Sequence, residues 1–478
     1  MKYHPLSKRL GLVLGPLLFI ILQAFSIELI SEKADVVIAT ALWMIVWWIT
    51  EAVSISVTSL LPLLLFPLFK VMPMNDVGAN YGSPIVFLFF GGFVLALALE
   101  KVNLHKRIAL TIIKLTGTTP NKVILGFMLA TAFMSMWISN TASTVVMLPI
   151  ALSVINLLIH DEDGFTKKDQ NFALSVMLGI AFSANAGGIA TIIGTPPNSV
   201  LIGLLENEYH IEISFLNWLL IGLPFSATLI AIIYMILIKL FPNKGLVFNT
   251  SKSVINDELK KLGKISPKEK QVLITFGIIV SLWIFRTVIN TIFPNLRLND
   301  TMISILGAIA LFAVPHNLKQ GDFILSWKDT KNLAWGILIL FGGGLALAKG
   351  MSTTGIVNIV TTAISDNNIS ILFTASLLIL LMLFMTELMS NVALVAVLAP
   401  VVAGIAIGLE IPILYLLIPV TMASSCAFML PMATPPNAIV FASGFIKVHQ
   451  MARVGIILNL ISVALLIVMF QFVIPLIF

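Results

Sequence analysis

Long apolar segments recur along almost the whole of this chain, and only short polar loops separate them. A helix needs about twenty apolar residues to cross the hydrocarbon core of a bilayer, and most of these segments reach that length. The pattern therefore predicts an all-α polytopic membrane protein. The apolar segments fall at 10–30, 35–49, 52–69, 84–99, 123–159, 171–205, 216–241, 271–292, 300–315, 333–349, 370–409, 411–446 and 454–478.

The composition excludes a soluble fold. The chain has 478 residues, of which 59% are hydrophobic and only 10% charged, and its mean hydropathy is +1.05. Soluble globular proteins contain about 25% charged residues, so the lipid bilayer is the solvent that suits this chain. The net charge is +6, but the basic residues gather in a few short loops, as in the cytoplasmic loops of membrane proteins. We therefore expect no nucleic-acid partner.

The first apolar segment has two interpretations. Lys8 and Arg9 precede the run 10–30, as in a signal peptide. The run is long enough to span a bilayer, however, and no clear small-residue cleavage site follows it. We expect residues 1–34 to form an N-terminal membrane helix.

Four of the segments are unusual. Those at 123–159 and 370–409 are about twice the length of one span, and each has an uncharged polar cluster at its middle. They predict hairpins that enter and leave on the same side, since irregular backbone at membrane depth is tolerated only inside protein or beside a watery cavity. The segments 171–205 and 411–446 each contain a Pro-Pro pair, which predicts a discontinuous helix.

Charge and hydropathy agree on one topology. With the N-terminus cytoplasmic, eleven spans and two re-entrant hairpins, 23 of the 28 Lys and Arg residues fall on the cytoplasmic side. The C-terminus is then external, and the cell membrane (plasma or inner) is the expected location. The segment 242–268 is the only long polar loop, and we interpret it as a cytoplasmic linker between two halves.

The two halves share residues at fixed offsets. Phe90-Gly91-Gly92 and Phe341-Gly342-Gly343 are 251 residues apart, as are Ser139-Asn140 and Ser390-Asn391. Thr-Pro-Pro-Asn occurs at 195–198 and again at 434–437, an offset of 239. In the predicted topology the repeat 35–241 begins outside and the repeat 269–478 begins inside, so the repeats are inverted. Inverted repeats with paired broken helices indicate a transporter with its site at the bilayer midplane.

The candidate site consists of the two hairpin tips and the two helix breaks. A break frees backbone carbonyls, which are suitable Na⁺ ligands, and exposes helix N-termini, which favour carboxylates. Asn, Ser and Thr side chains add further donors and acceptors. The tips are Ser139-Asn140-Thr141 and Ser390-Asn391-Val392, and the breaks are 194–198 and 433–437.

Structural alternatives exist for each of these features. Ser and Asn can simply hydrogen-bond neighbouring helices, and Pro-Pro can simply kink a helix, although the duplication makes both explanations weaker. Glu51 and Glu387 are carboxylates within apolar segments, and each fits either a functional role or a structural cap at a helix end. The segments 123–159, 171–205 and 411–446 contain no charged residue. An anion bound here would therefore be held by dipoles, amides, hydroxyls and co-bound cations.

The chain resembles the divalent anion/sodium symporter family, which carries dicarboxylates, citrate and sulfate. The stretch 424–440, which reads SSCAFMLPMATPPNAIV, is similar to the family signature, and Trp48-Ile49-Thr50-Glu51-Ala52 is similar to its early motif. The resemblance spans nearly the whole chain. It implies eleven membrane helices, two re-entrant hairpins and a homodimer that works by an elevator mechanism.

The resemblance also implies site residues. It places carboxylates near the two Ser-Asn tips, Thr195, Thr434 and Pro435. It places one Na⁺ at Ser135, Ser139, Asn140 and Gly194, and a second at Thr386, Met389, Asn391 and Ala433. Val392 departs from the family pattern because it replaces a hydroxyl, which favours a slim dicarboxylate such as succinate, malate, fumarate or 2-oxoglutarate.

Several alternatives remain open at this point. Transport coupled to Na⁺ and exchange of one dicarboxylate for another are both compatible with the sequence, and sulfate or citrate is an alternative substrate. An anion channel is a further possibility, although no ring of charges is evident. An enzyme is not expected, because no nucleophile–base pair, metal-ligand cluster or phosphate-binding loop occurs. We expect no cofactor other than Na⁺ as a coupling ion.

Overall fold

The computed structural model describes residues 5–25, 31–117, 119–159, 165–243, 251–317, 322–365 and 370–478. These residues are almost entirely helical, and the one sheet among them pairs the short strands β1 (Pro315–Asn317) and β2 (Asp322–Phe323). The prediction of an all-α fold is confirmed.

The first half of the chain contains twelve α-helices within the described ranges. They are α1 (Pro5–Ala24), α2 (Glu32–Thr50), α3 (Ile55–Thr58), α4 (Leu61–Leu68), α5 (Met74–Tyr81), α6 (Pro84–Lys101), α7 (Leu104–Thr116), α8 (Pro120–Ser135), α9 (Asn140–Ile159), α10 (Lys167–Gly188), α11 (Pro196–Tyr209) and α12 (Phe215–Leu240).

The second half begins with a helix inside the predicted linker. Its described helices are α13 (Ser251–Lys261), α14 (Pro267–Ile292), α15 (Asp300–Ala313), the 3-10 helix η1 (Trp327–Asn332), α16 (Trp335–Thr353), α17 (Ile356–Ser365), α18 (Ile371–Met385), α19 (Asn391–Gly408), α20 (Ile413–Ser424), α21 (Pro435–Phe441), α22 (Val448–Val468), the π-helical turn η2 (Met469–Val473) and α23 (Ile474–Ile477).

Many of these helices suit a bilayer. Within the described ranges, eight helical segments are long and apolar enough to cross one: α1, α2, α5 with α6, α12, α14, α16, α19, and α22 with its continuation. Shorter apolar helices, such as α15, α18 and α20, accompany them. The molecule is therefore a multi-pass membrane protein, while the number of eleven spans stays a prediction.

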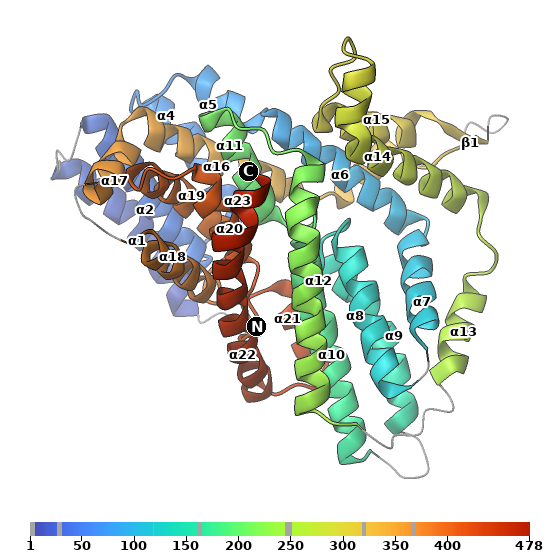
Figure 1. Ribbon diagram of the computed structural model, residues 1–478. Coiled ribbons are helices and arrows are strands. Elements are labelled where there is room, and N and C mark those ends of the chain that lie inside the picture. The colour runs from blue at the N-terminus through green and yellow to red at the C-terminus, as the bar shows by residue number, and fades with distance from the viewer. Residues whose placement is uncertain are drawn as a thin grey trace.

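The halves correspond helix by helix, which agrees with the sequence repeat. The series α6 to α9 recurs as α16 to α19 at the offset of 251 found in the sequence, and α10 to α12 recur as α20 to α22. Figure 1 shows α7, α8 and α9 at one side of the molecule and α17, α18 and α19 at the other. The division at 35–241 and 269–478 remains our proposal for the domain boundaries.

The two halves interlock through their broken helices. The short helix α21 of the second half packs on α9 and α10 of the first, and α11 of the first half packs on α19 and α20 of the second. Each half therefore completes the core of the other. Figure 1 shows α21 next to α10, near the centre of the molecule.

The linker region is fastened to the first half. In the described part of 242–268, α13 packs on α7, and Lys106 forms an ion pair with Glu258 at 2.9 Å. Hydrogen bonds from Lys261 and Lys106 lower the pKa of the Glu258 carboxyl. Arg107 on α7 binds Glu269 at the start of α14 through two nitrogens, at 2.6 and 3.2 Å. These contacts position α7, which leads into the first hairpin.

Candidate functional site

Both predicted hairpin tips are helix–turn–helix structures. Helix α8 ends at Ser135 and α9 begins at Asn140, whereas α18 ends at Met385 and α19 begins at Asn391. In the first tip the exposed Ser139 hydroxyl accepts a hydrogen bond from the Ala142 amide at 3.2 Å, as an N-cap does. Each Asn is therefore the first residue of its helix, at the positive end of the helix dipole.

Both Pro-Pro pairs mark real interruptions. Helix α10 ends at Gly188 and α11 begins at Pro196, and α20 ends at Ser424 and α21 begins at Pro435. The prolines occupy the first two helical positions, where their missing N–H groups cost nothing. Thr195 and Thr434 are the extended residues just before these helices, and both are buried.

The first tip and the first break meet in a cluster of oxygens. The buried Ser135 hydroxyl lies 2.6 Å from Asn140 Oδ1 and 2.7 Å from the Ala184 carbonyl oxygen on α10. A hydroxyl has one proton and can donate to only one of these oxygens. With the amide in this orientation the cluster is one proton short.

The Asn140 amide has two useful orientations. Turned over, its nitrogen donates to Ser135 Oγ at 2.6 Å and to the Gly194 and Ala184 carbonyls at 3.3 Å each. With its oxygen facing inwards, four oxygens converge instead. The backbone must come very close here, because a Cβ on Gly188 would overlap the Asn140 side chain and one on Gly194 would lie 2.5 Å from the Gly188 oxygen. At Gly194 a larger residue would collide with backbone, whereas at Gly188 it would displace the Asn140 side chain from the cluster.

The second half repeats the cluster. The buried Thr386 hydroxyl lies 2.7 Å from Asn391 Oδ1 and 2.7 Å from the Ser424 carbonyl oxygen on α20. Again one proton serves two acceptors. The structure thus brings together Ser135 with Asn140, and Thr386 with Asn391. Ser135 corresponds to Thr386, and Asn140 to Asn391, at the offset of 251.

The other predicted residues lie around these clusters. Met389, Ser390 and Val392 are half-buried in and beside the second tip, and Thr141 is half-buried beside the first. Ala433 is buried in the second break, where its amide donates to the Leu430 carbonyl at 3.2 Å, and Pro435 is exposed. No side-chain hydrogen bond joins Thr195 to a tip among the described residues, so its contribution stays a proposal.

The Asn of each Thr-Pro-Pro-Asn motif holds the break together. Asn198 Nδ2 donates to the Thr191 carbonyl at 2.9 Å, and Asn437 Nδ2 donates to the Leu430 carbonyl at 3.1 Å. The acceptors are 239 residues apart, like the two donors. These amides satisfy carbonyls that the interruption leaves without helical partners.

Sequence reasoning missed one residue that connects the halves. Asn185 lies on α10, next to Ala184 of the first cluster, and its side-chain nitrogen donates to Thr434 Oγ1 of the second break at 3.0 Å. The same nitrogen lies 3.4 Å from Asn437 Oδ1 and 3.3 Å from the Ala427 carbonyl. An Asn in the uncharged segment 171–205 was a visible signal, but comparison of the repeats does not select it because no Asn matches it in the second half.

The two carboxylates noted in the sequence have different environments. Glu51 is half-buried and ends α2 in the left-handed conformation, with φ 46°. Glu387 is only 3% exposed and accepts hydrogen bonds from the second break, so the structural-cap interpretation fits its contacts. Neither residue belongs to the oxygen clusters.

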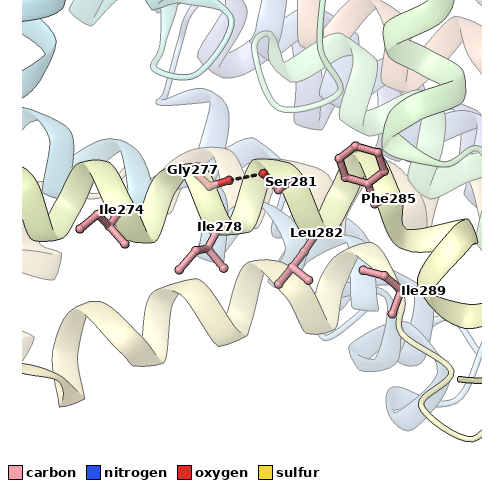
Figure 2. Close-up of a pocket in the computed structure, with 7 residues that line it drawn as sticks. All are labelled: Ile274, Gly277, Ile278, Ser281, Leu282, Phe285 and Ile289. Carbon is pink, nitrogen blue, oxygen red and sulfur yellow. Dashed lines mark hydrogen bonds between the residues drawn. The ribbon is translucent and has the colours of Figure 1, made fainter. Parts of the chain in front are cut away.

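An apolar groove elsewhere on the surface does not suit an anion. It has a volume of about 460 Å³ and follows one stretch of α14. Figure 2 shows Ile274, Ile278 and Leu282 pointing the same way from this helix. The Ser281 hydroxyl already donates to the Gly277 carbonyl at 2.8 Å. The paired clusters are therefore the better candidate site.

Apolar helices of spanning length, two hairpin tips and two interrupted helices define a polytopic helical membrane protein built from two corresponding halves. The chain belongs to the family whose model is described as the sodium:sulfate symporter transmembrane region, which matches residues 8–478. The family and the relatives described next are transporters rather than enzymes. The resemblance found in the sequence is thus confirmed.

Two relatives have the same printed description, sodium-dependent dicarboxylate transporter SdcS. The protein from Staphylococcus saprophyticus is 39% identical over 485 aligned residues, which cover 99% of this chain and 93% of that protein. The protein from Staphylococcus aureus strain USA300 is also 39% identical, with coverage of 100% and 93%.

Two solved structures share the fold. The YdaH transporter of Alcanivorax borkumensis has a TM-score of 0.56 at 12% identity, covering 84% of this chain and 88% of that one. MtrF of Neisseria gonorrhoeae, described as one of a class of antimetabolite efflux pumps, has a TM-score of 0.51 at 12% identity, covering 84% and 83%. At this identity the likeness concerns the fold alone.

The role of Asn437 gives a prediction. Asn437→Ala removes the donor that both the Ala427 and Leu430 carbonyls share at 3.1 Å. Each carbonyl keeps one other donor, the Asn185 side chain for Ala427 and the Ala433 amide for Leu430. The change therefore removes two buried hydrogen bonds, each worth about 0.5–1.5 kcal/mol. We expect a lower melting temperature in detergent, measured by tryptophan fluorescence. Asn358→Ala, at an exposed position on α17, is the control and should melt like the wild type. Equal melting of both variants would contradict the structural role of Asn437.

Proposed function

We propose that this protein is a secondary active transporter that carries C4 and C5 dicarboxylates, such as succinate, malate, fumarate and 2-oxoglutarate, by Na⁺ symport. One observation carries the proposal: the chain contains two matched oxygen clusters, each with a hydroxyl placed between two acceptors. A cation in each cluster would stabilise these oxygens, in the first cluster with the amide oxygen of Asn140 facing inwards.

The donor set suits Na⁺. Hydroxyl, amide and backbone carbonyl oxygens are hard neutral ligands, the kind that hard cations prefer. In the first cluster Ser135, Ser139, Asn140 and Gly194 would hold one Na⁺, with the amide oxygen of Asn140 turned inwards. In the second, Thr386, Met389, Asn391 and Ala433 would hold another. The relatives described as sodium-dependent support this assignment.

The substrate anion would lie between the tips and the breaks. Helices α9, α11 and α19 all begin there, and their N–H groups and dipoles favour carboxylates. Contacts would come from Ser139, Asn140, Thr141, Thr195, Ser390, Asn391, Val392, Thr434 and Pro435. The helices α8 to α11 and α18 to α21 contain Lys or Arg only near the distant starts of α8 and α10. The bound Na⁺ ions would therefore balance the charge of the anion.

The second tip favours a slim substrate. Val392 stands where the first tip has Thr141, so one hydroxyl fewer is available for a third carboxylate. We therefore propose a dicarboxylate rather than citrate, and rather than the sulfate named in the family description. The same substitution favours a second candidate, Na⁺-independent exchange of one dicarboxylate for another.

We further propose the cell membrane as the location, with a cytoplasmic N-terminus and an external C-terminus. The distribution of Lys and Arg supports this orientation. A homodimer and an elevator-type alternation between the two faces of the membrane complete the proposal, and the resemblance to the family supports both.

Uptake of labelled succinate into proteoliposomes tests the proposed function. Two variables are crossed: external Na⁺ and internal dicarboxylate, each present or absent. We expect uptake into empty vesicles that requires Na⁺. Uptake that requires internal dicarboxylate and ignores Na⁺ would show exchange instead. If no carboxylate enters under any of the four conditions, the substrate class is wrong, and labelled sulfate tests the alternative.

Substitution of Asn140 and of Asn391 tests the proposed site by mutation. Asn140→Ala and Asn391→Ala each remove the amide from one cluster. A hydrogen bond or ligand contact to a charged group contributes about 1.5–3 kcal/mol, so affinity should fall tenfold or more. We expect uptake to be abolished while size-exclusion chromatography still shows a folded dimer. Uptake at the wild-type rate in either variant would refute the site.

Accessibility of the linker tests the orientation. The region 239–270 holds eight Lys residues, which supports a cytoplasmic location. The only native cysteine, Cys426, is buried, so a single Ser253→Cys variant can be read clearly. We expect a membrane-impermeant maleimide to label it in lysed cells and not in intact cells. Strong labelling from outside would reverse the topology and the inversion of the repeats with it.

A further inference from the structure

Glu387 caps the second break with three backbone hydrogen bonds and lies beside the second oxygen cluster in the chain. It follows Thr386 of the second cluster directly in the chain and is 3% exposed. Its Oε1 accepts from the Phe428 and Met429 amides at 2.8 and 2.9 Å, and its Oε2 accepts from the Leu430 amide at 3.0 Å. Three successive N–H groups of the interruption thus converge on one carboxylate.

A fourth donor comes from another helix. Asn459 on α22 donates to Glu387 Oε1 at 2.7 Å, and Asn459 is itself fully buried. Helices α18 to α21 contain no Lys, Arg or His. The four N–H donors satisfy the carboxylate oxygens by hydrogen bonding, but a net negative charge remains in a poorly hydrated region.

The first half joins its tip to its break without a charged side chain. Met136 occupies the position 251 residues before Glu387, and its backbone carbonyl accepts a hydrogen bond from the Thr191 hydroxyl at 2.5 Å. Thr191 corresponds to Leu430 at the offset of 239. In both halves, therefore, the residue after the cluster hydroxyl fastens the tip to the break, but only the second half uses a carboxylate.

We propose that Glu387 is a positioning residue that makes the two Na⁺ sites unequal. It holds the second break in place next to Thr386, and its charge favours a cation in the second cluster over the first. The second site then binds Na⁺ more tightly and fills before the first. This inference rests on the proposed function, since it assumes that the clusters bind Na⁺.

The variant Glu387→Gln removes the charge of the side chain and keeps nearly the same shape. The Gln oxygen can keep the three bonds of Oε1, whereas its amide nitrogen faces the Leu430 N–H, donor against donor. The variant thus keeps most of the geometry and loses the charge. Asn459→Leu does the reverse, because it removes one hydrogen bond and leaves the charge. Glu410→Gln is the control, since Glu410 is an exposed carboxylate of the same half.

Two measurements apply to each purified variant. The first is the Na⁺ concentration for half-maximal succinate uptake, together with the KM for succinate at saturating Na⁺. The second is the stabilisation of the protein against heat by Na⁺ alone, without succinate. For Glu387→Gln we expect the half-maximal Na⁺ concentration to rise about tenfold, the size of a charge-assisted contact. The KM at saturating Na⁺ should change less than about threefold.

The other variants should behave differently. Asn459→Leu should melt earlier but keep its half-maximal Na⁺ concentration within about threefold of the wild type, and Glu410→Gln should match the wild type in both. An unchanged Na⁺ dependence in Glu387→Gln would overturn the proposal. An equal shift in Asn459→Leu would also overturn it, because lost packing would then explain both variants.

Failure of the proposed function gives a separate result. If wild-type uptake ignores Na⁺ and Na⁺ does not stabilise the wild-type protein, the clusters are not Na⁺ sites and the inference about Glu387 falls with them. If the wild type depends on Na⁺ and Glu387→Gln shows the same Na⁺ dependence, the function stands and the role of Glu387 is refuted.

Discussion

Interrupting a helix inside an apolar core leaves backbone N–H and C=O groups without partners, and each half of this protein contains such an interruption. Unpaired groups of this kind are too costly to bury, so side chains must replace the lost helical bonds. Asn198 and Asn437 supply donors to the free carbonyls, and Glu387 supplies acceptors to the free amides. The polar residues around the candidate site are thus needed for the fold itself.

The same requirement explains why the site is preorganised. The carbonyl of Ala184 stands at the end of α10, where Ser135 reaches it at 2.7 Å, and the Ser424 carbonyl stands at the end of α20, where Thr386 reaches it at 2.7 Å. Because each tip is fastened to a break, a ligand bound at the proposed site would meet oxygens that are already in place. Asn185 extends this arrangement across the molecule, since it binds Thr434 of the other half.

The sequence predicts the helical fold, the tips and the breaks because these features leave periodic or duplicated marks. The offset of 251 pairs Ser135 with Thr386 correctly, and the Pro-Pro pairs locate both interruptions. The roles of the Asn residues were harder to separate. Asn140 and Asn437 are the same residue type in similar motifs, but one lies in an oxygen cluster and the other holds backbone carbonyls. Their roles follow from local backbone geometry, which places Asn140 beside the Ser135 hydroxyl and Asn437 beside the Leu430 carbonyl. A residue pattern does not show that geometry.

The two halves differ in the charge beside the cluster and in the room left for a side chain at the break. The first break has Gly194 where the second has Ala433, and a Cβ at Gly194 would lie 2.5 Å from the Gly188 oxygen. The first cluster is therefore the tighter of the two, and it is also the one without a neighbouring carboxylate. A cation in a neutral cluster depends most on an anion bound nearby, because no fixed negative charge attracts the cation there. Cation and anion would then stabilise each other most strongly in the first half, which is where coupling between them is expected to arise.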